Sequence, residues 1–234
     1  MRRGVRLLGT LMIVAGVLTL GWAVLVWQWQ DPFTAAYTKW EQHQLASQLD
    51  RRMTQFSSHD RAPSLAALRV EVAKDAATYR KNLHRGDAIG RLTIGALGLK
   101  IILVQGTDHE SLKKGPGHYI GSALPGQGRL VYIAGHRTTY LAPFSHIDAL
   151  KPGEYVTIDL PYATFKYVVT KHRVVAATDV DVLRSPNHEV LILQACHPRF
   201  FATHRYLVYA KPVSVTPRGG TSHALGDSRV ALGR

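Results

Sequence analysis

The chain has 234 residues, 46% of them hydrophobic, so it can bury the core of one medium-sized domain and carry appendages. Its 29 Lys and Arg residues against 16 Asp and Glu residues give a formal net charge of +13, but they are dispersed, with no basic helix or aromatic-interleaved strip, which argues against nucleic-acid binding. The single cysteine, Cys196, excludes an internal disulfide framework.

An uncharged apolar segment covers residues 7–26. As a helix rising ~1.5 Å per residue it would be about 30 Å long, which matches the hydrocarbon core of a bilayer. Arginines precede it and tryptophans gather at its far end, which predicts a cytoplasmic N-terminus and an extracytoplasmic remainder. A cleaved signal peptide is the alternative, but no small-x-small cleavage site follows Val26. We therefore predict a membrane-spanning signal anchor over residues 1–30.

Two helices are predicted in the next part of the chain, residues 31–86. Apolar residues recur near helical spacing over residues 35–56 and 65–84, in a composition rich in Ala, Gln and charged residues. A proline and capping-type residues around 57–63 predict a break between the helices. We expect a solvated helical stalk that holds the following domain away from the membrane.

Short apolar runs rich in Val, Ile, Tyr and Thr dominate residues 87–216, and turn sequences such as GALG, LPGQG and KPGE separate them. Roughly seven or eight strands with little helix predict a mainly β domain, either a closed or nearly closed barrel or a sandwich. Residues 217–234 lose this pattern and are predicted to form a disordered tail.

Cys196 ends the apolar run LILQAC, where a predicted strand meets the loop element HPRFF. A thiol inside an apolar strand is inert because burial raises its pKa, whereas a strand end beside basic groups favours the nucleophilic thiolate. Position alone leaves both interpretations open, a core-filling side chain and a nucleophile.

Two other residues also fall at predicted strand ends. His136 follows the run RLVYIAG, and imidazole is a natural proton shuttle for a thiol. Arg205 begins the strand after the Cys196 loop, so pairing of the two strands would return it to the same end of the sheet. A guanidinium there can stabilise an oxyanion. The alternatives are a surface histidine and a strand-edge arginine.

AGHRTTYLAPF and LILQACHPRFFATHR together resemble the catalytic signature of sortases, the membrane-anchored cysteine transpeptidases of bacterial surfaces. The resemblance covers about residues 87–215 and the anchor-and-stalk layout before them. GPGHYIGSALPG, GHRTTY and CHPRF are most similar to the class E group. Two residues differ from the family pattern: Ala195 stands where sortases commonly have threonine, and Leu141 where class E members often have glycine.

The resemblance implies a closed eight-stranded β-barrel of the sortase type, preceded by the membrane helix and the stalk. It also implies Cys196, His136 and Arg205 as catalytic residues, without a metal or cofactor. Tyr119 occupies the place of a family tyrosine associated with LAxTG-type rather than LPxTG-type signals. Further residues of these motifs are expected to bind substrate: Thr138, Tyr140, Ala195 and His197.

The implied reaction cleaves a C-terminal sorting signal of a surface protein between Thr and Gly and transfers the protein to an amine of a peptidoglycan precursor. The expected partners are therefore surface proteins, that precursor and membrane lipid, and not nucleic acid. Two alternatives stay open: a membrane-anchored cysteine peptidase that only hydrolyses, and a non-catalytic extracellular binding domain. A metal site of Cys196, His197 and His204 is disfavoured, because structural zinc normally takes four ligands in paired spacings.

Overall fold

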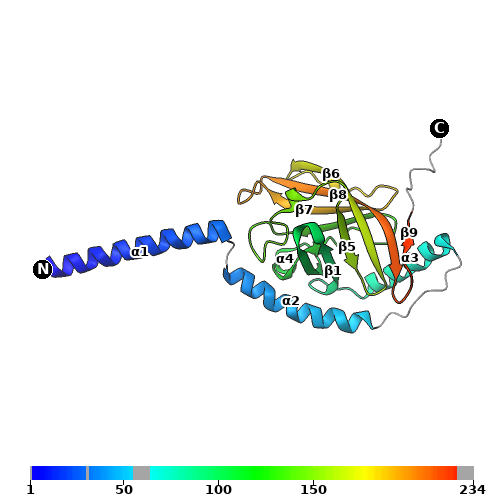
Figure 1. Cartoon of the computed structure of the whole chain (residues 1–234), viewed down its shortest axis with the longest axis horizontal. Helices are drawn as coiled ribbons and strands as arrows, with labels where there is room; N and C mark the ends of the chain where they lie inside the picture. Colours follow the sequence, from blue (N-terminus) through cyan, green and yellow to red (C-terminus); the bar gives the residue numbers. More distant parts are fainter. Residues whose placement is uncertain (1, 30–31, 55–63, 226–234) are drawn as a thin grey trace.

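Eight strands close into a barrel in the computed structural model, which describes residues 2–29, 32–54 and 64–225 (Figure 1). The strand order is β6-β5-β1-β2-β3-β4-β7-β8, and pairing of β8 with β6 closes the ring. The pairs β2–β3 and β4–β7 are parallel. The strands are β1 (Ala88–Ile94), β2 (Leu99–Gln105), β3 (Gly117–His118), β4 (Leu130–Gly135), β5 (Tyr155–Asp159), β6 (Ala163–Ala176), β7 (Val190–His197) and β8 (His204–Pro217). The predicted closed eight-stranded barrel is confirmed.

The barrel encloses the main hydrophobic core. Strand residues alternate between the interior and the outer face, so Leu191, Leu193 and Ala195 of β7 are fully buried inside. Tyr162, Phe165 and Tyr167 are its largest buried side chains, together with Phe144 from the long β4–β5 connection. The seven predicted strands all form. β3 was missed because two residues are too short to show a pattern.

The two helices predicted for residues 31–86 are present as α2 (Pro32–Met53) and α3 (Leu65–Lys81). The prediction that they form a solvated stalk is wrong. Both pack on the barrel: α3 adds Leu68, Val72, Ala76 and Tyr79 to the main core, and α2 packs Leu45 and Leu49 against Ala88, Ile102 and Val104. The predicted break falls at residues 57–63, outside the described residues, and α3 begins with an N-cap at Ser64.

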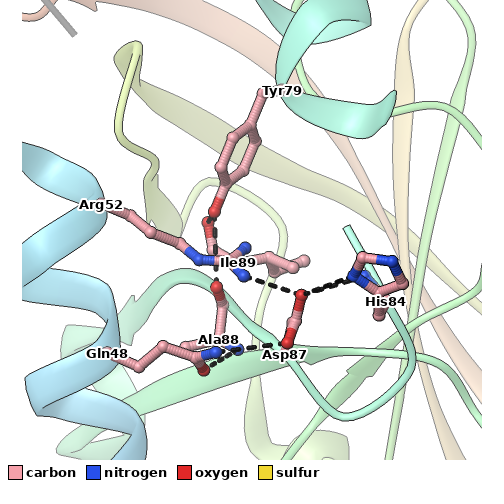
Figure 2. A network of polar contacts seen from close by, with 7 residues as sticks. All are labelled: Gln48, Arg52, Tyr79, His84, Asp87, Ala88 and Ile89. Carbon is pink, nitrogen blue, oxygen red and sulfur yellow. Dashed lines mark hydrogen bonds and ion pairs between the residues drawn. The ribbon is translucent and has the colours of Figure 1, made fainter. Parts of the chain in front are cut away.

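A polar network fastens the end of α2 to the start of β1 (Figure 2). Arg52 donates to the Asp87 carboxylate at 2.7 Å, and Gln48 binds both that carboxylate and the backbone N–H of Ala88. Burial would raise the pKa of Asp87, but the backbone N–H of His84 and the Arg52 guanidinium outweigh it and lower this pKa. Asp87 is therefore ionised at neutral pH and ties α2 to the barrel.

The predicted disordered tail is wrong for residues 217–225. A short strand, β9 (His223–Ala224), pairs with β8, and Arg218 forms an ion pair with Asp159 at 2.8 Å. Because Gly and polar residues dominate this segment, its order depends on contacts with distant residues that no local pattern reveals. The remainder of the predicted tail, residues 226–234, lies outside the described residues.

The N-terminal segment forms one long helix, α1 (Arg2–Trp29). An 18-residue window within Arg2–Val24 has a mean hydropathy of 2.1, and none of that window is buried against the other described residues. By length and composition α1 can cross a membrane. It projects away from the barrel in Figure 1, and the rings of Trp22 and Phe33 lie 5.7 Å apart where it meets α2.

Candidate active site

The three candidate catalytic residues stand at the same end of three adjacent strands. β4 and β7 are parallel with Gly135 opposite Ala195, so His136 and Cys196 follow at the same level. β8 returns antiparallel to β7 with Arg205 directly opposite Cys196. The central strand of this group therefore carries the thiol between the two basic side chains.

One cleft of about 330 Å³ on the outer face of the barrel is lined by Cys196, His136 and Arg205 together. Its floor includes Tyr132 of β4 and Gln194 of β7, and the β6–β7 connection forms one wall. Cys196 is half-buried and makes no disulfide. Its position on the outer face follows from strand alternation, which sends its neighbour Ala195 into the core.

The His136 imidazole is partly withdrawn from solvent. Its Nε2 atom is buried and has no hydrogen-bond partner among the described residues, while Nδ1 lies 3.5 Å from the Thr139 hydroxyl. Burial lowers the pKa of His136, and the nearby His109 lowers it further. The neutral imidazole is therefore favoured, with one nitrogen available to a reacting group.

A left-handed turn follows His136. Tyr140, Leu141 and Ala142 have φ values of 54°, 63° and 38°, a region that costs non-glycine residues energy. The Tyr140 ring lies 5.0 Å from the His136 ring, and the Tyr140 backbone N–H donates to the Thr34 hydroxyl of α2 at 3.2 Å. The turn thus links α2 to the imidazole.

Close packing also fixes the start of this loop. A Cβ atom at Gly135 would lie 2.6 Å from the Phe144 ring, closer than any side chain tolerates. The Phe144 backbone N–H in turn donates to the His136 carbonyl at 3.0 Å. Glycine at position 135 therefore lets the chain leave β4 over a buried aromatic ring.

Arg205 is held by the loop that joins β7 to β8. Its Nη1 donates to the carbonyls of Ala202 and His204, at 2.7 and 3.0 Å. Its Nε and Nη2 atoms have no hydrogen-bond partner among the described residues, and the side chain lines the cleft. The guanidinium is thus oriented by one nitrogen and retains N–H donors for a ligand.

Arg137 is a site residue that the sequence did not reveal. Its side chain is 4% exposed and lies behind the cleft, where Nη1 donates to the Cys196 carbonyl at 3.3 Å and lies 3.0 Å from His197 Nδ1. Nη2 pairs with Asp148 at 2.8 Å, and the guanidinium lies 5.7 Å from the Tyr206 ring. Arg137 therefore connects the histidine loop to the strand end that carries the thiol.

Only some of the predicted substrate-binding residues line the cleft. Tyr119 lines the cleft, with its ring edge-on to Tyr132 at 6.3 Å. Ala195 is fully buried in the barrel core, and His197 contacts Arg137. Alternation along β7 places neither residue on the cleft face, so this geometry does not support their predicted contacts with substrate.

Thr138 and Tyr140 also lie outside the cleft lining. Tyr140 instead contacts the His136 ring, which makes it a neighbour of the imidazole. Tyr132 and Gln194 are among the lining residues that were missed. Each lies four or two positions before a candidate catalytic residue, so strand alternation would have indicated them. No group of three or more His, Cys, Asp or Glu side chains within the described ranges is arranged to hold a metal ion.

Comparison with known proteins matches the sortase domain family to residues 92–213. Sortase D of Bacillus subtilis is 31% identical over 149 residues, which cover 62% of this chain and 73% of that protein. The structure of sortase E from Streptomyces avermitilis is 32% identical, with a TM-score of 0.52, and the match covers 57% of this chain and 93% of that one.

A sortase D5 transpeptidase of Clostridium perfringens has a similar fold. Its structure has a TM-score of 0.60 at 23% identity, and the match covers 74% of this chain and 98% of that one. The barrel, the family match over more than half of the chain and the similarity to the Bacillus subtilis protein agree: the chain belongs to the sortase family of cysteine transpeptidases.

Proposed function

We propose that this protein is a membrane-tethered sortase that cuts a C-terminal sorting signal through Cys196 and joins the carried protein to a cell-wall amine. The observation that supports it most is the content of the cleft. A free thiol shares one cavity with a buried imidazole nitrogen and a guanidinium. Among the described residues, that nitrogen has no partner and the guanidinium keeps unused N–H donors.

In the first half-reaction the Cys196 sulfur attacks the scissile carbonyl, and neutral His136 takes the thiol proton. The oxyanion that forms is stabilised by the free N–H groups of Arg205. His136, now an imidazolium, returns its proton to the departing amine, and an acyl thioester on Cys196 remains. The lowered pKa of His136 suits this cycle, because the resting imidazole can accept a proton and then release it readily.

In the second half-reaction an amine attacks the thioester. His136 accepts the proton of the attacking amine and passes it to the departing Cys196 sulfur, which restores the free thiol and the neutral imidazole. The net change exchanges one amide bond for another, which differs from proteolysis only in that an amine replaces water.

The proposed donor is a surface protein whose signal is of the LAxTG or LPxTG type, cut between Thr and Gly. Tyr119, in the place of the family tyrosine, lines the cleft and supports an LAxTG preference. The proposed acceptor is an amine of a peptidoglycan precursor. With α1 as a single-pass anchor and its arginines in the cytoplasm, the barrel would face the extracytoplasmic side, where both substrates emerge.

The test uses the full-length chain in detergent micelles with an LAxTG-type peptide. Wild type should release the glycine-side fragment, and an added amine should appear on the threonine-side product. Cys196→Ala should abolish both while the circular dichroism spectrum stays unchanged. Cleavage by Cys196→Ala at the wild-type rate would reject the nucleophile, and hydrolysis unaffected by amine would indicate a peptidase instead.

A second variant tests the guanidinium. Arg205→Lys keeps the charge but loses the planar fork, so kcat should fall by about 100-fold. Arg173→Lys is the matched control, because Arg173 is exposed on β6 and does not line the cleft. Near-normal turnover of Arg205→Lys would make Arg205 a scaffold residue.

A further inference from the structure

A second cavity of about 310 Å³ adjoins the catalytic cleft. It lies between α3, the segment that precedes β4 and the end of the β6–β7 connection. We name it the distal pocket and define it by its polar and charged lining residues: Arg80, Ser122, Gln127, Arg129 and Ser185.

The distal pocket continues the catalytic cleft. Leu183 lines both cavities. On β4, Leu130 lines the distal pocket and Tyr132 lines the cleft, and residues two positions apart share one strand face. Tyr119 lines the cleft and Gly121 the distal pocket. Because three separate elements contribute neighbouring residues to both cavities, they form one groove along the outer face of β4.

The distal pocket is basic. None of the lining residues that the structure describes is acidic, and two of them are arginines. Arg80 donates one bond to the Ile120 carbonyl at 2.6 Å. Arg129 is exposed and makes no hydrogen bond or ion pair with any residue that the structure describes. Gln127 accepts a bond from the Leu124 N–H through Oε1, so its amide N–H groups remain as donors.

The groove has a definite length in residues of bound peptide. Leu130 precedes the level of Cys196 by about six strand positions, or about 20 Å at ~3.3 Å per residue. An extended peptide has nearly the same rise. A peptide whose scissile bond lies at Cys196 would therefore place the residue about five to seven positions away in the distal pocket.

We propose that the distal pocket is a subsite for an acidic side chain, Asp or Glu, on the threonine side of the sorting signal. The last four residues before the scissile bond are those of the LAxT stretch. The acidic residue, five to seven positions before that bond, would therefore precede the stretch by one to three residues. Guanidinium groups and amide donors suit a carboxylate. The threonine side is assigned because the acyl chain occupies the enzyme through both half-reactions, whereas the glycine side must clear for the incoming amine.

This inference rests on the proposed function and specifies its substrate class. The test uses peptides that carry Glu, Gln or Lys at one position, scanned five to seven residues before the scissile bond. Wild type should show a kcat/KM about three to ten times higher for Glu than for Gln, with Lys lowest, and added salt should reduce the difference. Arg129→Gln should remove most of the Glu advantage.

Arg51→Gln is the charge-matched control, because Arg51 is exposed on α2 and lines neither cavity. It should keep the full Glu advantage. Equal kcat/KM for the three peptides, an advantage that persists in Arg129→Gln, or an advantage only when Glu lies on the glycine side would each overturn the proposal.

A binding measurement separates this inference from the proposed function. Fluorescence anisotropy with Cys196→Ala should give a dissociation constant about three to ten times lower for the Glu peptide than for the Gln peptide. If wild type cleaves no peptide yet this difference appears and disappears with Arg129→Gln, the reaction assigned above fails while the subsite stands. If wild type cleaves all the peptides but they bind equally well, the subsite fails while the proposed reaction stands.

Discussion

Arg137 acts on the candidate active site from behind the cleft. It holds the Cys196 carbonyl and His197 through one nitrogen and Asp148 through another, and its side chain is almost fully buried. Hydrogen bonds that involve a charged group typically contribute about 1.5–3 kcal/mol each. Its main effect should be to fix the end of β7 relative to the loop that carries His136.

Arg137→Met should therefore lower both stability and turnover. We expect the free energy of unfolding to fall by about 2–3 kcal/mol and kcat to fall at least tenfold, since a carbonyl next to the thiol loses its donor. Urea denaturation and peptide turnover measure the two effects. Asp148→Asn is the control, because Asp148 is 46% exposed and its loss should cost far less. Equal effects of the two variants would contradict a positioning role for Arg137.

At this scale the sequence predicted the candidate residues whose place depends on their position along a strand. Cys196, His136 and Arg205 each stand at a strand end, and the order of the strands brought those ends together. Arg137 was not predictable, because its partner at Cys196 is 59 residues away and an arginine beside a strand end is usually solvated. Ala195 was expected at the substrate because of its motif, but strand alternation buries it.

At the scale of elements, α2 is joined to the barrel through polar side chains. Gln42 accepts from the Ile102 N–H at 2.7 Å and donates to the Ile102 carbonyl at 3.0 Å, as a neighbouring strand would. Thr38 donates to the Lys113 carbonyl. The sequence predicted a solvated helix because these residues are polar, and residue type does not distinguish a side chain that binds water from one that binds a strand edge.

The contact between Thr34 and Tyr140 extends this attachment to the candidate active site. Thr34→Val removes the acceptor for the Tyr140 N–H and loosens the left-handed turn beside His136. We expect kcat to fall about threefold to tenfold with little change in KM, measured by peptide turnover of the full-length chain.

Two variants make that result specific. Thr34→Ser keeps the hydroxyl and should restore kcat. Thr38→Val weakens the attachment of α2 at Lys113 without touching the turn, so it should lower the melting temperature more than kcat. If Thr34→Ser were as slow as Thr34→Val, the hydroxyl would have no part in positioning His136.

At the scale of the whole molecule, a buried histidine makes stability depend on pH. His118 lies inside the protein, where Nε2 is 2.9 Å from the Ala123 carbonyl and Nδ1 is 2.9 Å from Gln105. Burial lowers the pKa of His118 from 6.5 to about 4. Between these values the unfolded chain binds the extra proton, so stability present above pH 6.5 is lost as the pH falls towards 4, by about 3 kcal/mol in all.

Urea denaturation at several pH values between 7 and 4.5 tests this contribution. The difference in unfolding free energy between wild type and His118→Gln should shrink as the pH falls, because the variant has no proton to gain on unfolding. His43→Gln, at an exposed position of α2, should show no such trend. A difference that stays constant across this range would contradict the assignment to His118.

A mainly β domain was predictable because short apolar runs and turn signals repeat along residues 87–216. That pattern left a barrel and a sandwich open, and the closed eight-stranded barrel was implied by the resemblance to sortases. What the sequence did not supply was the attachment of the flanking segments. α2, α3 and β9 join the barrel through contacts between residues far apart in the chain, such as Arg52 with Asp87 and Arg218 with Asp159. Such contacts follow from the finished fold and leave no periodic signal.

The attachment of α2 limits how far the enzyme can travel. With the proposed topology, α1 ends at Trp29 and α2 begins at Pro32, a gap of at most about 11 Å of extended chain. Because α2 packs on the barrel, no long linker would allow Cys196 to move far from the membrane surface. Its working range would be a thin layer above the lipid headgroups, and a cargo protein would have to be captured there before it diffuses into the wall.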